Sequence, residues 1–496
     1  MIAGLGLLIA TSLSAPTVQG TTRLDTFEKR DLASTLAPRL SSGATIIFPQ
    51  DPEWQNVTER WTKYLAPSFK VAIEPACEND VREIVKYAVS KNINFLAQNG
   101  RHGYAPELQR VQQGILINME QLDHVKIDKT TGIVTVGGGT VYEQVINATY
   151  AAGREMTVGS CPCVGVLGAG LGGGHGRLQG LHGMSIDSMR RMRVVLASGK
   201  AINVSPTENA DLWYGIRGAG QNFGVVIEAD FQTASQVPKG SHYDVEMQFA
   251  DSKLEKVLEL MNQQIKAPLP PQLAVDIVFG ANTTTLKPII AINFVYAGPQ
   301  SEGQKWSAPW KALGPLSFVE ANFNWSELPF KAANGLIAAQ CLKYGFKNTY
   351  SVNLKTFNTA TMRAVYTSWG NFLAAHPNVN ASTILFEVYG QQAVRAAPSD
   401  GSAFPNRFVS NILTVITSWY TTPSLSRTVD TWTSNLRTQM QATSGYDKLH
   451  VYQNYAHSEP LEAFYGYESY RLPRLQALKK KFDPGNVFGN YHPIPV

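Results

Sequence analysis

Residues 159–176 read GSCPCVGVLGAGLGGGHG, and this stretch decides the fold. Eight of its eighteen residues are glycine. Glycine lets the backbone approach a ligand closely and leaves N–H groups for anionic oxygens, so a diphosphate is the natural candidate. The stretch lacks the Gly-Lys-Ser/Thr of a Walker A loop, and no helix with an acidic residue follows, as a GxGxxG turn requires. A flexible surface loop is the alternative, and the interspersed Val, Leu and Cys residues argue against it.

A second candidate is His102, in the polar turn Gln98-Asn99-Gly100-Arg101-His102-Gly103-Tyr104. This turn follows a short predicted strand, residues 94–97, and such a position presents side chains to a cleft. A single histidine is more often structural than functional, so His102 needs a second observation.

Helix and strand patterns alternate from about residue 71 to 231. Helices are predicted at 79–91, with Asn79 or Asp80 as N-cap, and at 141–152. Strands are predicted at 94–97, 114–118, 133–136, 193–197 and 224–231, with a hairpin turn at 197–200.

The texture changes after about residue 241, where apolar runs alternate with amphipathic helices. Strands are predicted at 275–279, 289–295, 409–417 and 449–455, helices at 253–266 and 470–482, and a loop at 397–405. This pattern indicates an antiparallel sheet with helices packed on it. The fold class is therefore α+β with two lobes, and periodicity alone does not assign the final segment to either.

Composition narrows the function classes. The chain of 496 residues is 44% hydrophobic and 16% charged, with a net charge of +5. Its one Lys run, residues 479–481, is interpreted as a solvated helix face. No patterned basic face indicates nucleic acid binding.

The N-terminus predicts secretion without a membrane anchor. Residues 2–13 are apolar but too few to span a bilayer, so residues 1–20 are interpreted as a signal peptide. Six Asn-x-Ser/Thr sequons fit a secretory route: Asn56, Asn147, Asn203, Asn282, Asn324 and Asn380.

Four cysteines, Cys77, Cys161, Cys163 and Cys341, are too few for a disulfide scaffold. Cys161-Pro-Cys163 has no second cysteine pair, so no metal site is predicted. If a cofactor takes one cysteine, at most one disulfide forms among the other three. The sequence allows Cys77 with Cys341 without establishing it.

Four motifs together resemble the FAD-linked oxidases of the vanillyl-alcohol oxidase superfamily, with the PCMH-type flavin fold. They are most similar to the berberine bridge enzyme-like branch and, in texture, to fungal FAD-linked oxidoreductases of secondary metabolism. The motifs are residues 98–104, residues 161–187, residues 209–226 and the C-terminal residues 475–488. The resemblance implies an FAD-binding domain at 45–238, a substrate domain at 239–440, and a C-terminal segment, 441–496, that returns to the FAD lobe.

The resemblance implies roles for single residues. His102 matches the position that bonds the flavin 8α-methyl, and Cys161 matches the position that bonds flavin C6. Cys161 is preferred to Cys163 because its spacing to residues 172–174 matches. Tyr452 matches a catalytic base, and Tyr104 a substrate-facing position. The other implied FAD-binding residues are Gln98, Asn99, Gly100, Arg101, Gly103, Gly159, Ser160, Val164, Gly165, Gly168, Gly172, Gly224, Val226 and Asn486.

The chain also departs from the family pattern. Arg101 replaces a glycine, and Gln98 replaces the arginine near the diphosphate. The predicted strand after Phe404-Pro-Asn-Arg407 carries no carboxylate, which disfavours the alkaloid-type base. Val164 is small at the position that guards oxygen access, which resembles the oxidases.

These features predict a monomeric FAD oxidase that acts on an alcohol or activated C–H of a small secondary metabolite or polyketide intermediate. Molecular oxygen would be the electron acceptor. The alternatives are an oligosaccharide oxidase, an FAD dehydrogenase, and a secreted binding protein that keeps the flavin fold without turnover.

Overall fold

The computed structural model describes residues 26–282, 284–408 and 412–496. The chain divides into two units, residues 1–38 and 39–496. In the first unit the described residues form helix α1 (Thr26–Asp31) and a π-helical turn (Leu32–Leu36). The predicted signal peptide lies outside the described residues. No helix within the described ranges is long and apolar enough to cross a membrane.

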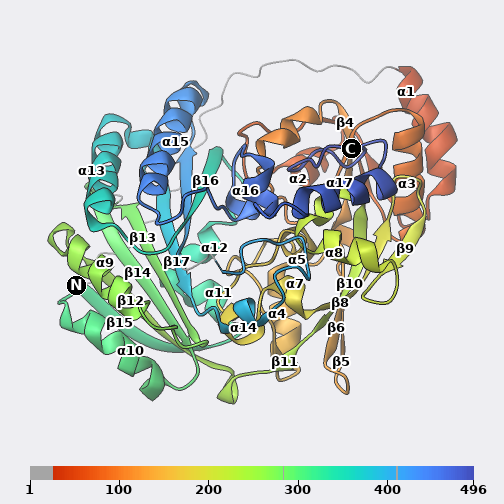
Figure 1. Ribbon diagram of the computed structural model, residues 1–496. Coiled ribbons are helices and arrows are strands. Elements are labelled where there is room, and N and C mark those ends of the chain that lie inside the picture. The colour runs from red at the N-terminus through yellow and green to blue at the C-terminus, as the bar shows by residue number, and fades with distance from the viewer. Residues whose placement is uncertain (1–25, 283, 409–411) are drawn as a thin grey trace. The chain divides into compact units, whose positions relative to one another are not determined.

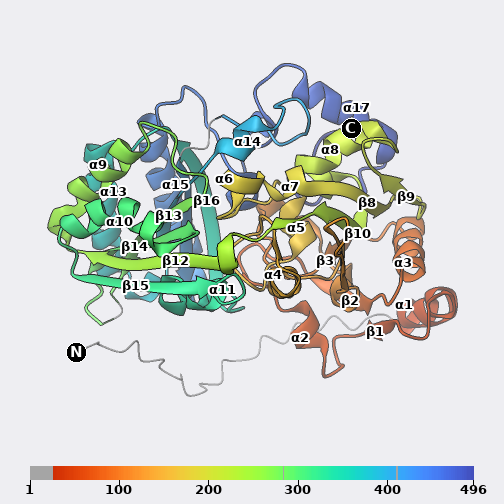
Figure 2. The ribbon, with the colours of Figure 1, turned by 90° about the horizontal axis from the view of Figure 1, so that it is seen from below.

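The second unit begins with a four-stranded sheet of order β1-β2-β4-β3 in the described chain; Figure 1 labels β4 and Figure 2 labels the other three strands. Its strands are β1 (Thr45–Ile47), β2 (Phe69–Glu74), β3 (Phe95–Gln98) and β4 (Gly114–Asn118). β2, β3 and β4 run parallel, so a crossover must join β2 to β3. Helix α3 (Glu78–Ser90) makes it. Short helices α2 (Trp54–Thr58) and η3 (Pro106–Arg110) flank this sheet.

Helix α3 forms as predicted but starts differently. Val81, Ile84, Val85 and Ala88 are fully buried, as their spacing requires. The N-cap is Cys77 rather than Asn79 or Asp80. Asp80 is the third helical residue, and its carboxylate accepts the N–H groups of Ala76 (3.0 Å) and Cys77 (3.2 Å). It therefore caps from inside the helix, as in a capping box.

A five-stranded antiparallel sheet of order β5-β6-β10-β8-β9 follows in the described residues (Figure 1). Its strands are β5 (Val125–Asp128), β6 (Ile133–Gly137), β8 (Met189–Val195), β9 (Ala201–Val204) and β10 (Val225–Gln232). The predicted hairpin between β8 and β9 is present, with Gly199 at φ +74°. Around this sheet lie α4 (Tyr142–Ala151), α5 (Val166–Gly170), α6 (Gln179–His182), α7 (Ser185–Ser188), α8 (Ala210–Ala219) and the two-residue pair β7 (Arg154–Glu155) and β11 (Ala234–Ser235).

The large sheet predicted after residue 241 is antiparallel, with described strand order β15-β12-β14-β13-β17-β18-β16. Its strands are β12 (Ser241–Phe249), β13 (Leu273–Ala281), β14 (Pro288–Ala297), β15 (Ser317–Asn324), β16 (Phe346–Leu354), β17 (Thr383–Tyr389) and β18 (Ile412–Tyr420). Helices α9 (Leu254–Gln264), α10 (Gln300–Ala312), α13 (Thr359–Ala375) and α15 (Ser426–Ala442) cover one face (Figure 1). Short helices α11 (Leu328–Lys331), α12 (Leu336–Ala339) and α14 (Gln392–Ala396) lie in the connections.

The other face of this sheet carries a row of polar side chains. Glu246 pairs in register with Asn293, Asn293 with Asp276, and Asp276 with Glu387. All four are buried. Because strand residues alternate between faces, this face points away from the apolar helical layer.

The C-terminal segment corrects one prediction. Residues 449–455 form no strand; Gln453–Tyr455 make a 3₁₀ turn, in which the Tyr455 N–H donates to the Tyr452 carbonyl at 2.8 Å. Helices α16 (Leu461–Tyr465) and α17 (Arg471–Phe482) follow. Leu475 and Ile494 belong to the same core as Val134 of β6.

The predicted solvated lysine run is only partly solvated. Lys480 and Lys481 are exposed. Lys479 is fully buried, and its Nζ donates to Asp483 at 2.6 Å. A buried carboxylate one turn away thus replaces water for this ammonium group.

All four cysteines lie in described ranges, and the pairing considered from the sequence is wrong. Cys163 is bonded to Cys341, whereas Cys77 and Cys161 are free. Cys77 is the N-cap of α3, whereas Cys161 and Cys163 lie in the glycine-rich stretch. The disulfide joins the glycine-rich stretch to the connection after α12.

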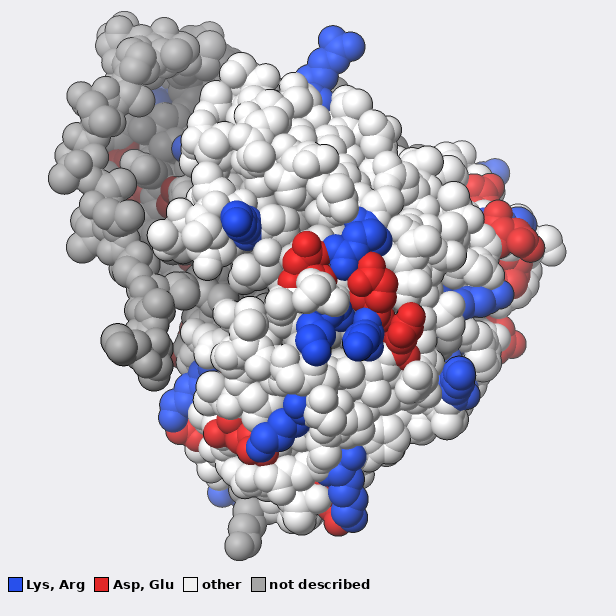
Figure 3. Space-filling model, turned by 90° about the vertical axis from the view of Figure 1, so that its left-hand side faces the viewer, with Lys and Arg blue, Asp and Glu red and all other residues white. Residues whose placement is uncertain are grey.

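Charges of both signs lie side by side on the face drawn in Figure 3, and most of that face is uncharged. The described residues on this face form no continuous basic patch.

Candidate active site

The turn at residues 98–104 packs directly on the glycine-rich stretch. A Cβ at Gly100 would lie 2.4 Å from the Cys163 carbonyl oxygen and 2.5 Å from the Gly165 nitrogen. Only glycine fits such a backbone contact. The Asn99 amide also donates to the Thr140 carbonyl at 2.7 Å. These contacts bring His102 and Cys161 together, as the motifs predicted.

Arg101 has a backbone conformation that favours glycine. Its φ is +64°, a region that L-residues other than Gly, Asn and Asp rarely enter. Its guanidinium is buried and donates to the Asn56 carbonyl and to the Glu120 carboxylate. The position is thus glycine-like in conformation, and an ion pair anchors the larger side chain.

Gln98 carries no charge, but Arg60 lies beside it and provides a cation at this position. The Arg60 guanidinium donates to Gln98 Oε1 and, at 2.6 Å, to the Gly103 carbonyl. Burial, followed by the charge of Arg101, lowers the Arg60 pKa to about 10. Among the described carboxylates, none forms an ion pair with it. Arg60 is a residue that the sequence motifs missed, since it precedes the first motif by 38 positions.

His102 is held as a neutral imidazole. Its ring stacks on Trp61 with centroids 5.5 Å apart, and its Nε2 lies 3.1 Å from Cys163 Sγ. Burial, with smaller effects from Lys347, Lys343 and Arg60, lowers the His102 pKa to about 3. A neutral ring keeps a lone pair on nitrogen at physiological pH and is therefore nucleophilic.

Cys161 is the free thiol of this site. Its Sγ lies 3.6 Å from both Cys163 Sγ and Cys341 Sγ. The nucleophilic atoms of His102, Cys161 and Cys163 all lie within 4.8 Å of one another. Burial raises the Cys161 pKa to about 12. The disulfide removes Cys163 as a thiolate ligand, so this cluster lacks a complete metal donor set.

A buried lysine stands next to these sulfurs. Lys347 of β16 is fully buried, and its Nζ donates to the carbonyls of Trp61 (2.8 Å) and Leu342 (2.5 Å). The ammonium also lies 4.0 Å from the ring centroid of Trp419, a cation–π contact. Burial lowers the pKa of Lys347 to about 7. The positive charge of Lys347 in turn lowers the pKa of Cys161, against the larger effect of burial. None of the sequence motifs includes Lys347. The one sign in the sequence is a lysine within residues 346–354, which form β16.

The glycine-rich stretch is buried from Leu171 to Gly180, so the surface-loop alternative is wrong. Gly173 and Gly174 have φ of +131° and +75°, values that favour glycine. The N–H groups of Gly174 and His175 both donate to Tyr452 Oη at 3.1 Å. Two of the N–H groups predicted to bind an anionic ligand therefore bind the predicted base.

Tyr452 and Tyr104 meet at Asn454. The Asn454 amide donates to Tyr452 Oη at 2.8 Å, and Tyr104 Oη donates to the Asn454 carbonyl. Burial raises the Tyr452 pKa to about 12, and the three N–H donors lower it because they favour the phenolate. Burial raises the pKa of Tyr104 well above its usual value.

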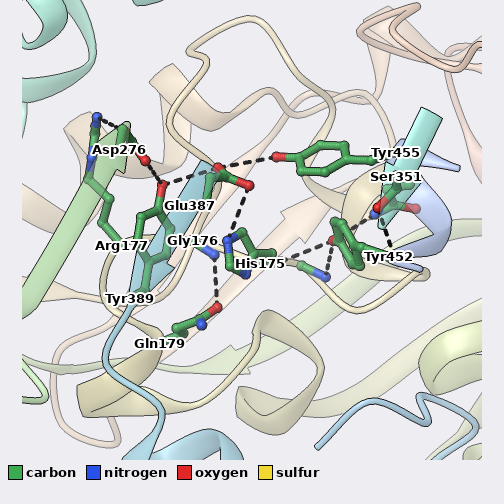
Figure 4. A network of polar contacts seen from close by, with 12 residues as sticks. His175, Gly176, Arg177, Gln179, Asp276, Ser351, Glu387, Tyr389, Tyr452 and Tyr455 are labelled. Atoms are coloured by element: carbon green, nitrogen blue, oxygen red, sulfur yellow. Dashed lines mark hydrogen bonds and ion pairs between the residues drawn. The ribbon is translucent and has the colours of Figure 1, made fainter. Parts of the chain in front are cut away.

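A buried polar network extends from this point into the sheet of the second lobe (Figure 4). Glu387 lies 3.5 Å from Tyr455 Oη, 3.1 Å from Tyr389 Oη and 3.4 Å from His175 Nε2. Tyr389 Oη also donates to Asp276 at 2.9 Å, and Arg177 pairs with Asp276 at 3.1 Å. None of the sequence motifs includes Glu387 or Asp276. The one sign in the sequence is that Asp276 places a carboxylate inside the apolar run 275–279.

The other predicted FAD-binding positions differ in burial. Gly159, Ser160, Val164, Gly103 and Gly224 are half-buried, Gly165, Gly172 and Val226 are buried, and Gly168 and Asn486 are exposed. A cavity of about 440 Å³ opens beside β10, lined by residues that include His124, Arg193 and Glu228. None of its lining residues was predicted to bind FAD.

Known proteins place the chain in a family. Residues 69–205 match the family model described as FAD binding domain, and residues 451–495 match the one described as berberine and berberine like. The chain is 38% identical over 457 residues to the FAD-linked oxidoreductase OXR1 of Pyricularia oryzae, covering 91% of this chain and 89% of that protein. It belongs to the berberine bridge enzyme-like FAD-linked oxidoreductases.

Three further proteins are similar to this chain in sequence or in fold. The chain is 34% identical to the FAD-linked oxidoreductase srdI of Neurospora crassa over 99% of this chain and 97% of that protein. Its fold matches the berberine bridge enzyme-like 1 protein of Physcomitrella patens with a TM-score of 0.80 at 21% identity, covering 94% and 98% of the two chains. It matches a xylooligosaccharide oxidase of Myceliophthora thermophila with a TM-score of 0.77 at 21% identity, covering 91% and 97%.

The residues of this berberine bridge enzyme-like oxidoreductase fit FAD. Gly100 allows the close backbone contact on which the loop depends. Arg60 supplies a buried cation without a carboxylate partner among the described residues, which suits a diphosphate. His102 and Cys161 supply a neutral imidazole and a free thiol.

Proposed function

We propose that this oxidoreductase is an oxidase with FAD attached through both His102 and Cys161. The observation that carries the proposal is the juxtaposition of a neutral imidazole and a free thiol at one glycine-dependent contact. Imidazole nitrogen and thiolate are both competent nucleophiles toward an electron-poor ring. The disulfide leaves Cys161, rather than Cys163, as the available sulfur.

The substrate class that we propose is an alcohol or activated C–H of a small secondary metabolite or polyketide intermediate. FAD held by these residues would supply a hydride acceptor for such a substrate, with O₂ as the final electron acceptor and H₂O₂ as the product. Tyr452 Oη takes the substrate proton. Its three N–H donors stabilise the phenolate and so support this role. Tyr104 positions Asn454, which supplies one of those donors.

The covalent link is tested by denaturing the pure protein in acid and reading the visible spectrum of pellet and supernatant. We expect flavin in the pellet, less firmly held in His102→Ala and in Cys161→Ala, and released in the double variant. Flavin in the supernatant of the wild-type protein contradicts covalent attachment. Absence of flavin from both fractions supports a binding protein without turnover.

The electron acceptor is tested by reducing the enzyme with substrate and following reoxidation in air. An oxidase reoxidises rapidly and releases H₂O₂, whereas slow reoxidation identifies a dehydrogenase. Val164, small at the predicted oxygen-access position, supports the oxidase, and Val164→Ile should slow reoxidation.

An oligosaccharide oxidase is the second candidate. The buried polar row Glu246, Asn293, Asp276 and Glu387 favours it, because such a surface can bind several hydroxyl groups. Oxygen uptake with a panel of oligosaccharides and aromatic alcohols separates the two substrate classes.

We further propose that the protein is a secreted monomer without a membrane anchor or nucleic acid partner. Asn56, Asn147 and Asn282 are exposed, which supports glycosylation there; Asn203, Asn324 and Asn380 are half-buried. A fall in mass after glycosidase treatment of the secreted protein, and its elution volume, test these expectations.

A further inference from the structure

Three sulfur atoms lie in one cluster beside the proposed FAD attachment point. Cys161 Sγ is 3.6 Å from each sulfur of the Cys163–Cys341 disulfide. It also lies 3.9 Å from the Ile337 carbonyl and next to the backbone of Cys163. Cys161 is thus equally placed to pair with either of the bonded cysteines.

Which of the three cysteines keeps a free thiol depends on which two are bonded to each other. With Cys163 bonded to Cys341, Cys161 stays a thiol. If Cys163 were absent, Cys161 and Cys341 would be neighbouring thiols. An external disulfide such as oxidised glutathione would take two electrons and two protons from them, becoming two thiols, and leave a Cys161–Cys341 bond.

We propose that the Cys163–Cys341 disulfide guards Cys161, because it keeps bonded to each other the two sulfurs with which an external disulfide could otherwise oxidise Cys161 to a disulfide. The proposal rests on the proposed function, because the guarded thiol is the one that would hold FAD. The guard positions the correct sulfur; it does not itself contact substrate.

Burial supports the guard. In the exchange reaction that would undo it, Cys161 thiolate attacks Cys341 Sγ, the Cys163–Cys341 bond breaks, and Cys163 leaves as thiolate. Only the thiolate attacks. The raised Cys161 pKa keeps this group protonated and the exchange slow.

A purely structural clamp is less needed at this point, because other bonds already hold the same connection. Trp61 Nε1 donates to the Gln340 carbonyl at 2.8 Å, and Lys347 Nζ donates to the Leu342 carbonyl. These bonds lie on either side of Cys341. They predict that the connection keeps its place without the disulfide.

The test compares Cys163→Ala, Cys341→Ala and the Cys163→Ala/Cys341→Ala double variant, with Cys77→Ala as control. Each full-length protein is alkylated without reduction, digested and mapped by mass spectrometry for disulfides and for flavin on the Cys161 peptide. In Cys163→Ala we expect a Cys161–Cys341 bond and at least a fivefold loss of flavin on Cys161. The double variant should return to within twofold of wild type, and Cys77→Ala should match wild type.

The double variant decides the question. If it loses as much Cys161-linked flavin as Cys163→Ala, the disulfide is a clamp and the guard is overturned. A free Cys161 thiol in Cys163→Ala overturns it as well. If Cys163→Ala does not fold, Cys341→Ala gives the same comparison, with a Cys161–Cys163 bond expected.

A flavin-free experiment distinguishes failure of the guard from failure of the proposed FAD attachment. The same variants are refolded without FAD in oxidised glutathione and mapped. A Cys161–Cys341 bond in flavin-free Cys163→Ala supports the guard even if the wild-type Cys161 peptide carries no flavin. A free Cys161 there overturns the guard whatever the flavin result.

Discussion

Lys347 is a single residue whose charge reaches the sulfur cluster. Replacing it with Met keeps the length of the side chain and removes the cation, so the pKa of Cys161 should rise further. Each unit of rise lowers the thiolate fraction about tenfold. We expect slower flavin attachment to Cys161 and a shift to higher pH in the alkylation rate of that thiol.

Lys343→Met is the matched control. Lys343 acts on His102 but is not among the groups that shift Cys161. An alkylation profile that is unchanged in Lys347→Met, or equally shifted in Lys343→Met, contradicts the role given to Lys347.

Arg60 makes a second prediction at this scale. In a His102→Ala/Cys161→Ala background, FAD binds without these links and its Kd can be measured. A charge-assisted hydrogen bond contributes about 1.5–3 kcal/mol, so Arg60→Met should weaken FAD binding roughly 10- to 100-fold. Arg110 is an exposed arginine of η3 and serves as the control. Arg110→Met should leave the Kd for FAD unchanged. Equal effects of the two substitutions on this Kd would contradict the role given to Arg60.

At the scale of elements, helix α17 ends on a buried ion pair. Asp483 accepts from Lys479 Nζ at 2.6 Å and from the N–H groups of Val487 and Phe488, each at 2.9 Å. Asp483→Asn leaves Lys479 as an unpaired buried charge. Breaking such a pair costs about 3–5 kcal/mol, so the urea midpoint should fall clearly.

The same helix offers the control. Lys481 pairs with Asp211 at the same 2.6 Å distance, but both side chains are exposed. Surface pairs contribute about 0–1 kcal/mol, so Asp211→Asn should hardly move the midpoint. Equal shifts would show that burial is not what gives the Lys479–Asp483 pair its strength.

Most elements could be predicted because they depend on local patterns. The strand at 114–118 and the buried face of α3 follow from periodicity alone. The strand expected at 449–455 is a turn, because the Tyr452 side chain is fixed by N–H groups of a loop about 280 positions away. Arg60, Lys347 and Glu387 escaped prediction for the same reason: long-range packing, rather than local sequence, brings them to the site.

At the scale of the whole molecule, buried carboxyls make stability depend on pH. Burial, and then its neighbour Asp244, raises the pKa of Glu246, and burial raises that of Asp244. The folded state therefore binds more protons than the unfolded state above about pH 4.5. This contribution to stability is complete at lower pH and is lost as pH rises through the raised folded pKa values.

Glu246→Gln should flatten that dependence, since an amide does not titrate. We expect a smaller loss of Tm between pH 5 and pH 8 than in wild type, measured by calorimetry. Glu302→Gln, an exposed carboxylate on α10, should keep the wild-type slope. A Glu246→Gln slope equal to that of wild type contradicts the assignment of this pair.

The Cys163–Cys341 bond spans 178 positions of the chain. Strands β12 to β15 lie inside that closed ring, whereas their sheet neighbours β16 to β18 lie outside it. A protease that cuts the ring once would therefore not release a fragment. The nicked enzyme would migrate as one species without reductant and as two with it, so cut molecules would stay assembled and would be mistaken for intact protein on a non-reducing gel.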